Sequence, residues 1–392
     1  MGSDRLRVAI VGGGIGGLAA ANALVRRGIE VTVFEQAPAL GEVGAGVLIT
    51  PNSVRQLARM GLGEAVAELG GRVGAGSRYC RTDGSTVGPI RTADSEGAHG
   101  VYGMHRADLL GALAGALPAG VVRTGHRCVG FEQDAGSARL AFADGARAEA
   151  DVVVAADGIH SALQRYVAEP AEPVYSGHVA YRGLIASDAL PSWPRDAHLV
   201  WMGEGKHFMV YPVRGGGLLN YVGFLPSADA AEETWSGVGD PDALRAAFTG
   251  WDPLVGELLS RVETTYWWGL YDREPLPKWT NGRLTLLGDA AHPMLPHLGQ
   301  GANQSIEDGV ALAVMLDGGS PEDAPRALRS YEEFRRPRTA KVQEGARANG
   351  RRYDSQYEDL RERDAEIAAS GELRAWLYDH DVELRAGEFA RA

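Results

Sequence analysis

Residues 5–35 read RLRVAIVGGGIGGLAAANALVRRGIEVTVFE. An apolar segment is followed by a glycine turn, an alanine-rich segment of helical character, and a second apolar segment that ends on an acid. Gly12, Gly14 and Gly17 fit the pattern G-x-G-x-x-G. Between a strand and a helix, such glycines allow a tight turn, a close approach of the backbone to a pyrophosphate, and close contact of helix with strand.

Glu35 lies about 20 residues after the glycines, at the end of the second predicted strand. A carboxylate at this place can accept hydrogen bonds from ribose hydroxyls, and the amides at the helix N-terminus favour a phosphate. Glycine turns are common in a chain with 53 glycines, so a purely structural turn is the alternative. The surrounding strand, helix and acid favour a dinucleotide site, and at this point NAD and FAD both remain open.

The composition is that of an ordinary globular protein. The 392 residues suffice for two or three domains, and 45% of them are hydrophobic and 23% charged. The formal net charge of −12 argues against a nucleic acid or an anionic membrane as partner. We expect a cytoplasmic protein, because the sequence has no run of about 18 apolar residues and no signal-peptide core. Cys80 and Cys128 lack metal-binding spacing, and we expect no metal site.

The pattern along the chain predicts an α/β protein of more than one domain. Residues 179–185, 207–213 and 218–224 alternate in character and contain many aromatics. They predict an antiparallel sheet with one face on a core or a pocket. A long charged helix is predicted from Ala324 to about Tyr353, and its cluster Arg335-Arg-Pro-Arg338 is predicted to be a solvated face.

Two further motifs follow apolar strands far along the chain. One is Asp157-Gly158, and the other is Gly288-Asp289, which continues as Ala-Ala-His-Pro-Met-Leu-Pro-His-Leu-Gly-Gln-Gly-Ala-Asn303. Together with the N-terminal glycines, these motifs resemble those of the single-component FAD-dependent aromatic hydroxylases over nearly the whole chain. The segments similar to the salicylate hydroxylase and 6-hydroxynicotinate 3-monooxygenase group of that family are residues 175–183, 207–216, 271–279, 288–303 and 376–381.

The resemblance implies a Rossmann-like FAD-binding domain with an inserted α+β substrate domain, whose sheet is mostly antiparallel, and C-terminal helices. The FAD-binding domain would comprise residues 1–70, 100–170 and 281–323. The substrate-binding domain would comprise residues 71–99 and 171–280, and residues 324–392 would form the C-terminal helical segment.

The resemblance also implies a tightly and non-covalently bound FAD. Glu35 would bind the adenosine ribose, Arg106 would lie near the ribityl and pyrophosphate groups, and Asp289 would bind the ribityl chain. The amides of Gly299–Asn303 and the helix N-terminus there can approach the flavin, while Asp157 is expected to hold a turn beside it. The residues predicted to bind FAD are Gly12, Gly14, Gly17, Glu35, Gly46, Val47, Arg106, Asp157, Asp289, Pro293, Gly299, Gly301, Ala302 and Asn303.

The implied activity is NAD(P)H- and FAD-dependent monooxygenation of a small aromatic compound, which would be phenolic, hydroxybenzoate-like or indolic. The chain has one dinucleotide fingerprint, so NAD(P)H would dock transiently as a co-substrate. Reduced FAD and O2 would form a C4a-hydroperoxide that hydroxylates the ring, while the protein supplies a dry pocket. The alternatives are a natural-product tailoring epoxidase or hydroxylase acting on a larger polycyclic or alkene substrate, a flavin dehydrogenase or reductase without oxygen insertion, and a binding protein. We expect a monomer or a homodimer.

His207 is the candidate base of this reaction. In some hydroxybenzoate hydroxylases similar to this chain, a histidine at the equivalent place contacts the substrate hydroxyl, and imidazole titrates in the useful range. Tyr211 is the second candidate, since residues 207, 209 and 211 share one face of a strand. The alternatives are a hydrogen-bonded sheet histidine and a packing aromatic. The residues predicted to line the substrate pocket are Leu48, Arg182, Met209, Pro296 and His297.

Two of the pocket residues bear on the substrate. Leu48 stands where 6-hydroxynicotinate enzymes that resemble this chain have a histidine, which disfavours that substrate and favours a more apolar ring. Arg182 can bind a carboxylate with two parallel hydrogen bonds. It can equally pair with a neighbouring acid.

Overall fold

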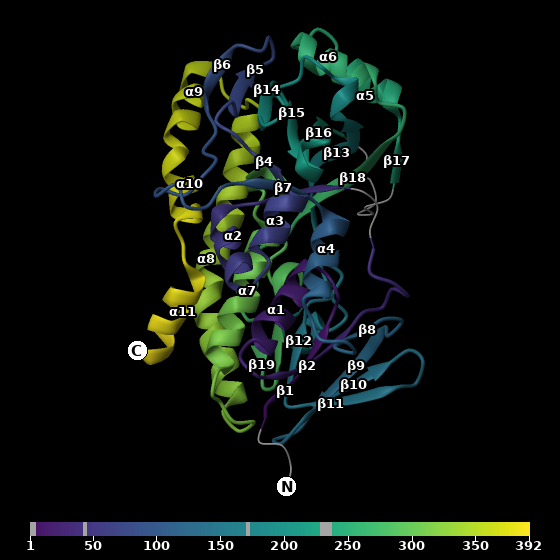
Figure 1. Ribbon diagram of the computed structural model, residues 1–392, viewed down its shortest axis with the longest axis vertical. Coiled ribbons are helices and arrows are strands. Elements are labelled where there is room, and N and C mark those ends of the chain that lie inside the picture. The colour runs from purple at the N-terminus through teal and green to yellow at the C-terminus, as the bar shows by residue number, and fades with distance from the viewer. Residues whose placement is uncertain (1–4, 42–44, 170–172, 228–236) are drawn as a thin grey trace.

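The computed structural model describes residues 5–41, 45–169, 173–227 and 237–392. A lower and an upper β-sheet are joined by the long helix α8 (Ala324–Tyr353), which runs beside both (Figure 1). Helix α8 contacts strand β19 (Thr280–Asn281) of the lower sheet and strand β14 (Leu199–Gly203) of the upper sheet. Within the described residues, no helix has both the length and the apolar character needed to cross a lipid bilayer.

The lower sheet is built on the glycine-turn segment. Strand β1 (Arg7–Val11) pairs in parallel with β2 (Glu30–Phe34) and with β12 (Val152–Ala155). These strands are almost wholly apolar, as expected for a parallel sheet buried on both faces. Helix α1 (Ile15–Val25) connects β1 to β2. Among the described residues the strand order is β19-β20-β12-β1-β2-β8, which includes β8 (Val122–Arg123) and β20 (Leu284–Leu286).

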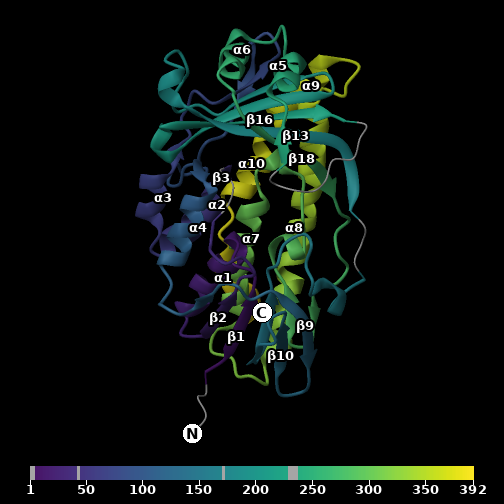
Figure 2. The ribbon, with the colours of Figure 1, turned by 90° about the vertical axis from the view of Figure 1, so that its right-hand side faces the viewer.

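The upper sheet is mostly antiparallel, which confirms the prediction. Along β15 (Lys206–Val213), Phe208 and Val210 pack under helices α5 and α6, which cover the outer face in Figure 2. Met209 and Tyr211 point to the opposite face, toward Tyr353 of α8. The described strands follow the order β17 (Gly237–Gly239), β18 (Thr265–Asp272), β13 (Val174–Ala186), β16 (Leu218–Pro226), β15, β14, β5 (Arg78–Arg81) and β6 (Thr86–Pro89); the covering helices are α5 (Pro241–Ala247) and α6 (Pro253–Ser260).

Smaller elements fill the space between and beside the two sheets. A short sheet in the order β3-β7-β4 lies between them, and the hairpin strands β9 to β11 extend from the lower sheet (Figure 1). The C-terminal helices run along one side of the molecule. The bounds are β3 (Gly46–Ile49), β4 (Gly71–Arg72), β7 (Tyr102–His105), β9 (Cys128–Gln133), β10 (Ala138–Phe142), β11 (Arg147–Ala150), α2 (Pro51–Arg59), α3 (Gly63–Leu69), α4 (Arg106–Gly115), α7 (Gly301–Leu316), α9 (Leu360–Ala369), α10 (Gly371–Tyr378) and α11 (Val382–Arg391).

Arg335 and Arg338 of helix α8 are buried, so the prediction of a solvated face is wrong for these two residues, although Arg336 and Pro337 between them do reach solvent. Arg335 places Nη1 2.7 Å from Glu307 Oε2 and Nε 2.7 Å from Asp308 Oδ1. Arg338 Nε lies 2.8 Å from Glu307 Oε2. The two guanidinium groups are tolerated in the interior because two carboxylates of α7 face them and compensate their charge.

Candidate active site

Segments that are far apart in the sequence meet at one cleft, with a cavity volume of about 480 Å³. The glycine turn after β1 and Glu35 after β2 line one part of it. Asp157 follows β12, and Asp289 lies in a 3-10 turn, Gly288–Ala290, after β20. Arg106, the first residue of α4, completes this set. The carboxyl ends of parallel strands share one edge of a sheet, and such an edge is where open α/β sheets bind ligands.

The three glycines of the turn differ in what surrounds them. Gly12 has a φ of +111°, and a Cβ there would lie 2.1 Å from the carbonyl oxygen of Ala156. A Cβ on Gly17 would lie 2.0 Å from the carbonyl oxygen of Gly12. Gly14 has no atom within 4 Å of such a Cβ, and it borders the cleft. Gly12 and Gly17 therefore serve close packing, while Gly14 leaves space for a ligand.

The carboxylates of the cleft are held by backbone amides. Glu35 accepts hydrogen bonds from Gly13 N at 2.7 Å and from Ala37 N at 2.7 Å, one at each oxygen. Asp157 accepts one from Ala162 N at 2.8 Å through Oδ2. Its Oδ1 is buried without a hydrogen-bond partner among the described residues, and burial raises the pKa of this carboxyl. A buried acceptor without a donor fits a ligand that brings hydroxyl or N–H groups.

Asp289 opens onto the cleft and is exposed to the space within it, although many protein atoms surround its carboxyl. Burial raises the pKa of its carboxyl, while the neighbouring His292 and Arg106 lower it. A Cβ on Gly301 would lie 3.9 Å from Asp289 Oδ1, so the N-terminus of α7 is adjacent. Carboxylate acceptors, an arginine and helix N-termini suit a ligand with both hydroxyl and phosphate groups. FAD carries both, and the cleft residues fit it.

The other residues predicted to bind FAD lie outside this cleft. Asn303 donates hydrogen bonds to the carbonyl oxygens of Leu48 and Gly299 at 2.9 and 2.7 Å, so it ties β3 to the loop before α7. Gly46 N donates to Asn220 Oδ1 at 2.8 Å. Gly299 has a φ of +63° and lines a second cavity. The predicted residues that line neither cavity are Gly17, Gly46, Val47, Pro293, Gly301, Ala302 and Asn303.

The second cavity is small, with a volume of about 30 Å³. Of the residues predicted for the substrate pocket, it is lined by Leu48, Met209, Pro296 and His297. Its remaining wall includes three residues from the C-terminal helices that sequence reasoning missed: Tyr353, Arg374 and Tyr378. A space of this size holds one or two waters, so an aromatic ring enters only if side chains move.

His207 lies behind this cavity and is fully buried. Its Nδ1 is 2.7 Å from Oδ1 of Asp354, the residue after helix α8, and Oδ2 of Asp354 is 3.3 Å from His178 Nε2. The ring centroids of His207 and His297 are 5.1 Å apart, and Phe224 stacks on His207 at 4.1 Å. Sequence reasoning missed Asp354, because 147 residues separate it from His207.

The two buried imidazoles differ in basicity. Burial lowers the pKa of His207, and the hydrogen bond and charge of Asp354 oppose this effect. Burial lowers the pKa of His297 to about 3, and the neighbouring His207 adds to the decrease. Nε2 of His207 and Nδ1 of His297 are buried without hydrogen-bond partners among the described residues. Of the two, His207 is the better proton acceptor.

Tyr211 and Arg182 lie near the second cavity but do not line it. Tyr211 is buried, its ring meets His198 edge to face at 5.7 Å, and burial raises the pKa of its hydroxyl. The Arg182 guanidinium lies over the Trp268 ring, 5.0 Å from the centroid. The predicted shared face of residues 207, 209 and 211 is present, because His207, Met209 and Tyr211 all point away from α5 and α6.

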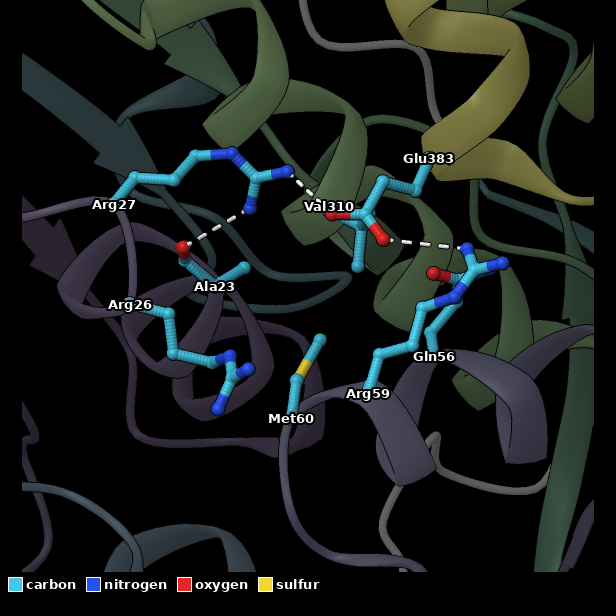
Figure 3. Close-up of a pocket in the computed structure, with 8 residues that line it drawn as sticks. All are labelled: Ala23, Arg26, Arg27, Gln56, Arg59, Met60, Val310 and Glu383. Atoms are coloured by element: carbon cyan, nitrogen blue, oxygen red, sulfur yellow. Dashed lines mark hydrogen bonds and ion pairs between the residues drawn. The ribbon is translucent and has the colours of Figure 1, made fainter.

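A further hollow of about 280 Å³ lies between helices α1, α2 and α11 (Figure 3). The carboxylate of Glu383 in α11 accepts hydrogen bonds from Arg27 Nη2 at 2.5 Å and from Arg59 Nη1 at 3.2 Å. These ion pairs connect the C-terminal helix to α1 and α2. None of the predicted site residues lines this hollow, whereas eleven of them line the cleft or the second cavity, which together form the candidate active site.

The fold and the cleft define an FAD-binding protein. Residues 5–346 match the protein family described as "FAD binding domain". The chain is 41% identical to 3-amino-4-hydroxybenzoate 2-monooxygenase of Streptomyces platensis over 389 residues, 97% of each chain. A solved salicylate hydroxylase substrate complex superposes with a TM-score of 0.86 at 30% identity, covering 99% of this chain and 98% of the other. A variant of HpxO of Klebsiella pneumoniae, solved in complex with FAD, superposes with a TM-score of 0.83 at 29% identity, covering 96% of this chain and 98% of the other.

The chain belongs to the single-component FAD-dependent aromatic hydroxylases, and FAD is its cofactor. This assignment decides between the dinucleotides that the glycine turn alone left open. The protein is accordingly a flavin-dependent monooxygenase of small aromatic compounds.

Proposed function

We propose that the protein uses NAD(P)H and O2 to hydroxylate a small phenol of the hydroxybenzoate type. The observation that carries this proposal is the His207–Asp354 pair beside the second cavity, with an imidazole nitrogen that has no partner among the described residues. The relative from Streptomyces platensis adds support, because its name specifies an amino-hydroxybenzoate and its length matches that of this chain. Leu48 adds apolar surface to the cavity, which suits a carbocyclic ring.

The cleft residues divide the binding of FAD among them. The glycine turn and the N-terminus of α1 bind the pyrophosphate, and Glu35 accepts from the adenosine ribose. Arg106, Asp157 and Asp289 hold the middle of the cofactor. The residues assigned to its other end are Gly46, Val47, Pro293, Gly299, Gly301, Ala302 and Asn303. Bound FAD would take a hydride from NAD(P)H and activate O2, one atom of which enters the ring while the other leaves as water.

His207 acts as the proton acceptor for the substrate hydroxyl. Asp354 accepts the Nδ1 proton, which fixes the tautomer and leaves Nε2 free to take a proton. His297 lines the cavity and can hydrogen-bond the hydroxyl, but its low pKa makes it a poor base. Tyr211 is the second candidate, and its buried hydroxyl stays protonated, so it serves as a donor rather than as a base.

The remaining partners follow from the family and the composition. NAD(P)H docks transiently, since the chain has one dinucleotide fingerprint. Residues 71–99 and 171–280 form the domain that covers the substrate. The protein works as a monomer or a homodimer in the cytoplasm, and size-exclusion chromatography with light scattering measures the oligomeric state.

A panel of hydroxybenzoates, phenols, indoles, alkenes and polycyclic aromatics tests the proposed function. We expect hydroxybenzoates to stimulate NADH or NADPH oxidation most strongly and to gain one oxygen atom from ¹⁸O2, measured by product mass. Released hydrogen peroxide is measured in parallel, because a poorly held substrate stimulates oxidation without being hydroxylated.

Two outcomes would overturn this proposal. If only alkenes or polycyclic compounds gain oxygen, the enzyme is a tailoring oxygenase. If an aromatic substrate turns over without consumption of O2, it is a dehydrogenase or a reductase.

A further inference from the structure

Arg374 of helix α10 is a buried cation for which the described residues provide no carboxylate partner. It is 7% exposed. Its Nε donates to the Tyr79 hydroxyl at 3.0 Å, Nη2 to that of Tyr353 at 3.0 Å and Nη1 to that of Tyr378 at 3.2 Å. Neutral tyrosines do not compensate the guanidinium charge, and a buried charge without a counter-ion is costly.

The cluster formed by Arg374, Tyr79, Tyr353 and Tyr378 has more donors than acceptors. A guanidinium has five N–H groups, and the three hydrogen bonds to tyrosine leave two of them for a further acceptor. Each tyrosine hydroxyl that accepts from Arg374 retains a proton. The hydroxyls of Tyr79 and Tyr353 lie 3.4 Å apart, so one of them donates to the other, and two of the three protons remain for a further acceptor. Asn349 Nδ2 is a further donor to Tyr353, at 3.0 Å. The missing component is an acceptor with negative charge.

The cluster borders the second cavity. Arg374, Tyr353 and Tyr378 all line it, and His297 and Gly299 line the same space. His198, which also lines it, is an imidazole and cannot serve as a counter-ion, and it adds no second positive charge, because burial and the charge of Arg374 lower its pKa to about 3. A carboxylate in this cavity would meet a guanidinium and hydroxyl donors, which together make strong charge-assisted hydrogen bonds.

We propose that Arg374, with Tyr353 and Tyr378, binds the carboxylate of an aromatic acid and so selects substrates with this group. The inference deepens the proposed function and rests on it for the aromatic ring. It moves the role of carboxylate recognition from Arg182, which lies over Trp268 and does not line the cavity, to the C-terminal helices. The ring then extends from the carboxylate toward His297 and the loop before α7.

Binding of benzoate and benzamide to the FAD-loaded protein tests this inference without turnover. The two ligands share the ring and differ in charge, and their affinities are measured by calorimetry. We expect the unmodified protein to bind benzoate about 10- to 100-fold more tightly than benzamide, the size of effect typical of a hydrogen bond to a charged group. Arg374→Gln is expected to bring this ratio close to one while the affinity for benzamide changes little.

Arg91→Gln is the matched control. Arg91 also lines the cavity, but it is partly exposed, and its guanidinium bonds Ala93 O at 3.1 Å and the exposed Ser95 Oγ at 2.7 Å. Water therefore solvates its charge, which is not buried like that of Arg374, and the benzoate preference should persist in this variant. If Arg374→Gln fails to fold, Tyr378→Phe, which removes one donor, is expected to reduce the ratio.

Equal affinities for benzoate and benzamide in the unmodified protein would overturn the inference. So would a preference for benzoate that survives in Arg374→Gln. A failure of the proposed function would be seen differently: no phenol would gain oxygen, whatever the ratio of the affinities for benzoate and benzamide. If phenols without a carboxylate bind and react as well as hydroxybenzoates, the proposed function stands and the inference fails.

Discussion

At the scale of single residues, Asp354 sets the basicity of His207. Their hydrogen bond of 2.7 Å opposes the effect of burial on the imidazole pKa. We predict that Asp354→Asn lowers the kcat of phenol hydroxylation by about 10²-fold, the lower range for loss of general base catalysis. The substrate dissociation constant should change little, because Asp354 does not line the cavity. Stopped-flow kinetics and a binding titration measure the two quantities.

The pH dependence separates this role from a structural one. Without Asp354 the pKa of His207 falls further, so the imidazole is a weaker base. The loss of rate should therefore shrink as the pH rises toward the pKa of the phenol, which then ionises without help. Asp359→Asn is the control, since Asp359 caps the exposed start of α9 and asparagine caps equally well. A uniform loss at every pH would contradict the assigned role.

Alanine substitutions at two glycines of the turn should have different effects. Gly17→Ala would place a Cβ 2.0 Å from the Gly12 carbonyl oxygen, so it should destabilise the fold itself. Gly14→Ala meets no atom within 4 Å, and its φ of −75° suits alanine. We predict that Gly14→Ala folds with an unchanged thermal midpoint without FAD but binds FAD more weakly. Scanning calorimetry and a fluorescence titration with FAD distinguish the two variants, and tight FAD binding by Gly14→Ala would contradict the assignment.

At the scale of elements, a buried charge network joins helices α7 and α8. Arg335 contacts both Glu307 and Asp308, and all three side chains are fully buried. We predict that Arg335→Met destabilises the protein by about 3–5 kcal/mol, because it leaves buried carboxylates without their partner. Chemical denaturation measures this free energy. Arg329→Met, at an exposed site on the same helix, is the control and should change it little.

The network also has a pH dependence. Burial raises the pKa of Glu307 and of Asp308, but the neighbouring arginines and, for Asp308, His292 outweigh it, and both pKa values lie below their ordinary range. Their contribution to stability is therefore present above the unfolded pKa values of about 4 and is lost as the pH falls below them. The gap in stability between the unmodified protein and Arg335→Met should narrow in acid. A gap that is constant down to pH 3 would exclude this electrostatic origin.

The same network shows what the sequence could predict about elements. Helix α8 was predicted with its observed bounds. The burial of its arginine side chains was not predicted, because a cluster of arginines usually faces solvent. The helical spacing contained the missing signal: Arg335 lies on the same face as Leu328, Tyr331 and Val342, which are all buried.

At the scale of the whole molecule, sequence patterns predicted the residues that line the cleft better than those that line the second cavity. The cleft is built at the ends of strands that carry local motifs, so residues such as Glu35, Asp157 and Asp289 could be found from motif and spacing. The cavity wall comes from helices packed against a distant sheet. Asp354 and Arg374 belong to no local motif, and only tertiary packing brings them to His207 and to the cavity.

We predict that the stability of the whole chain depends on FAD. The cleft joins the turn at residues 12–14, Asp157 and Asp289, so bound FAD links segments that are distant in the sequence. Removal of FAD should leave Asp157 Oδ1 as a buried acceptor without a donor and should lower the thermal midpoint. Since FAD binds the folded state, adding it back at 100 times its dissociation constant should restore about 2.7 kcal/mol. Gly14→Ala should recover less at the same FAD concentration. A thermal midpoint that does not change on addition of FAD would contradict this prediction, because it would show that FAD does not supply the donor that Asp157 Oδ1 lacks.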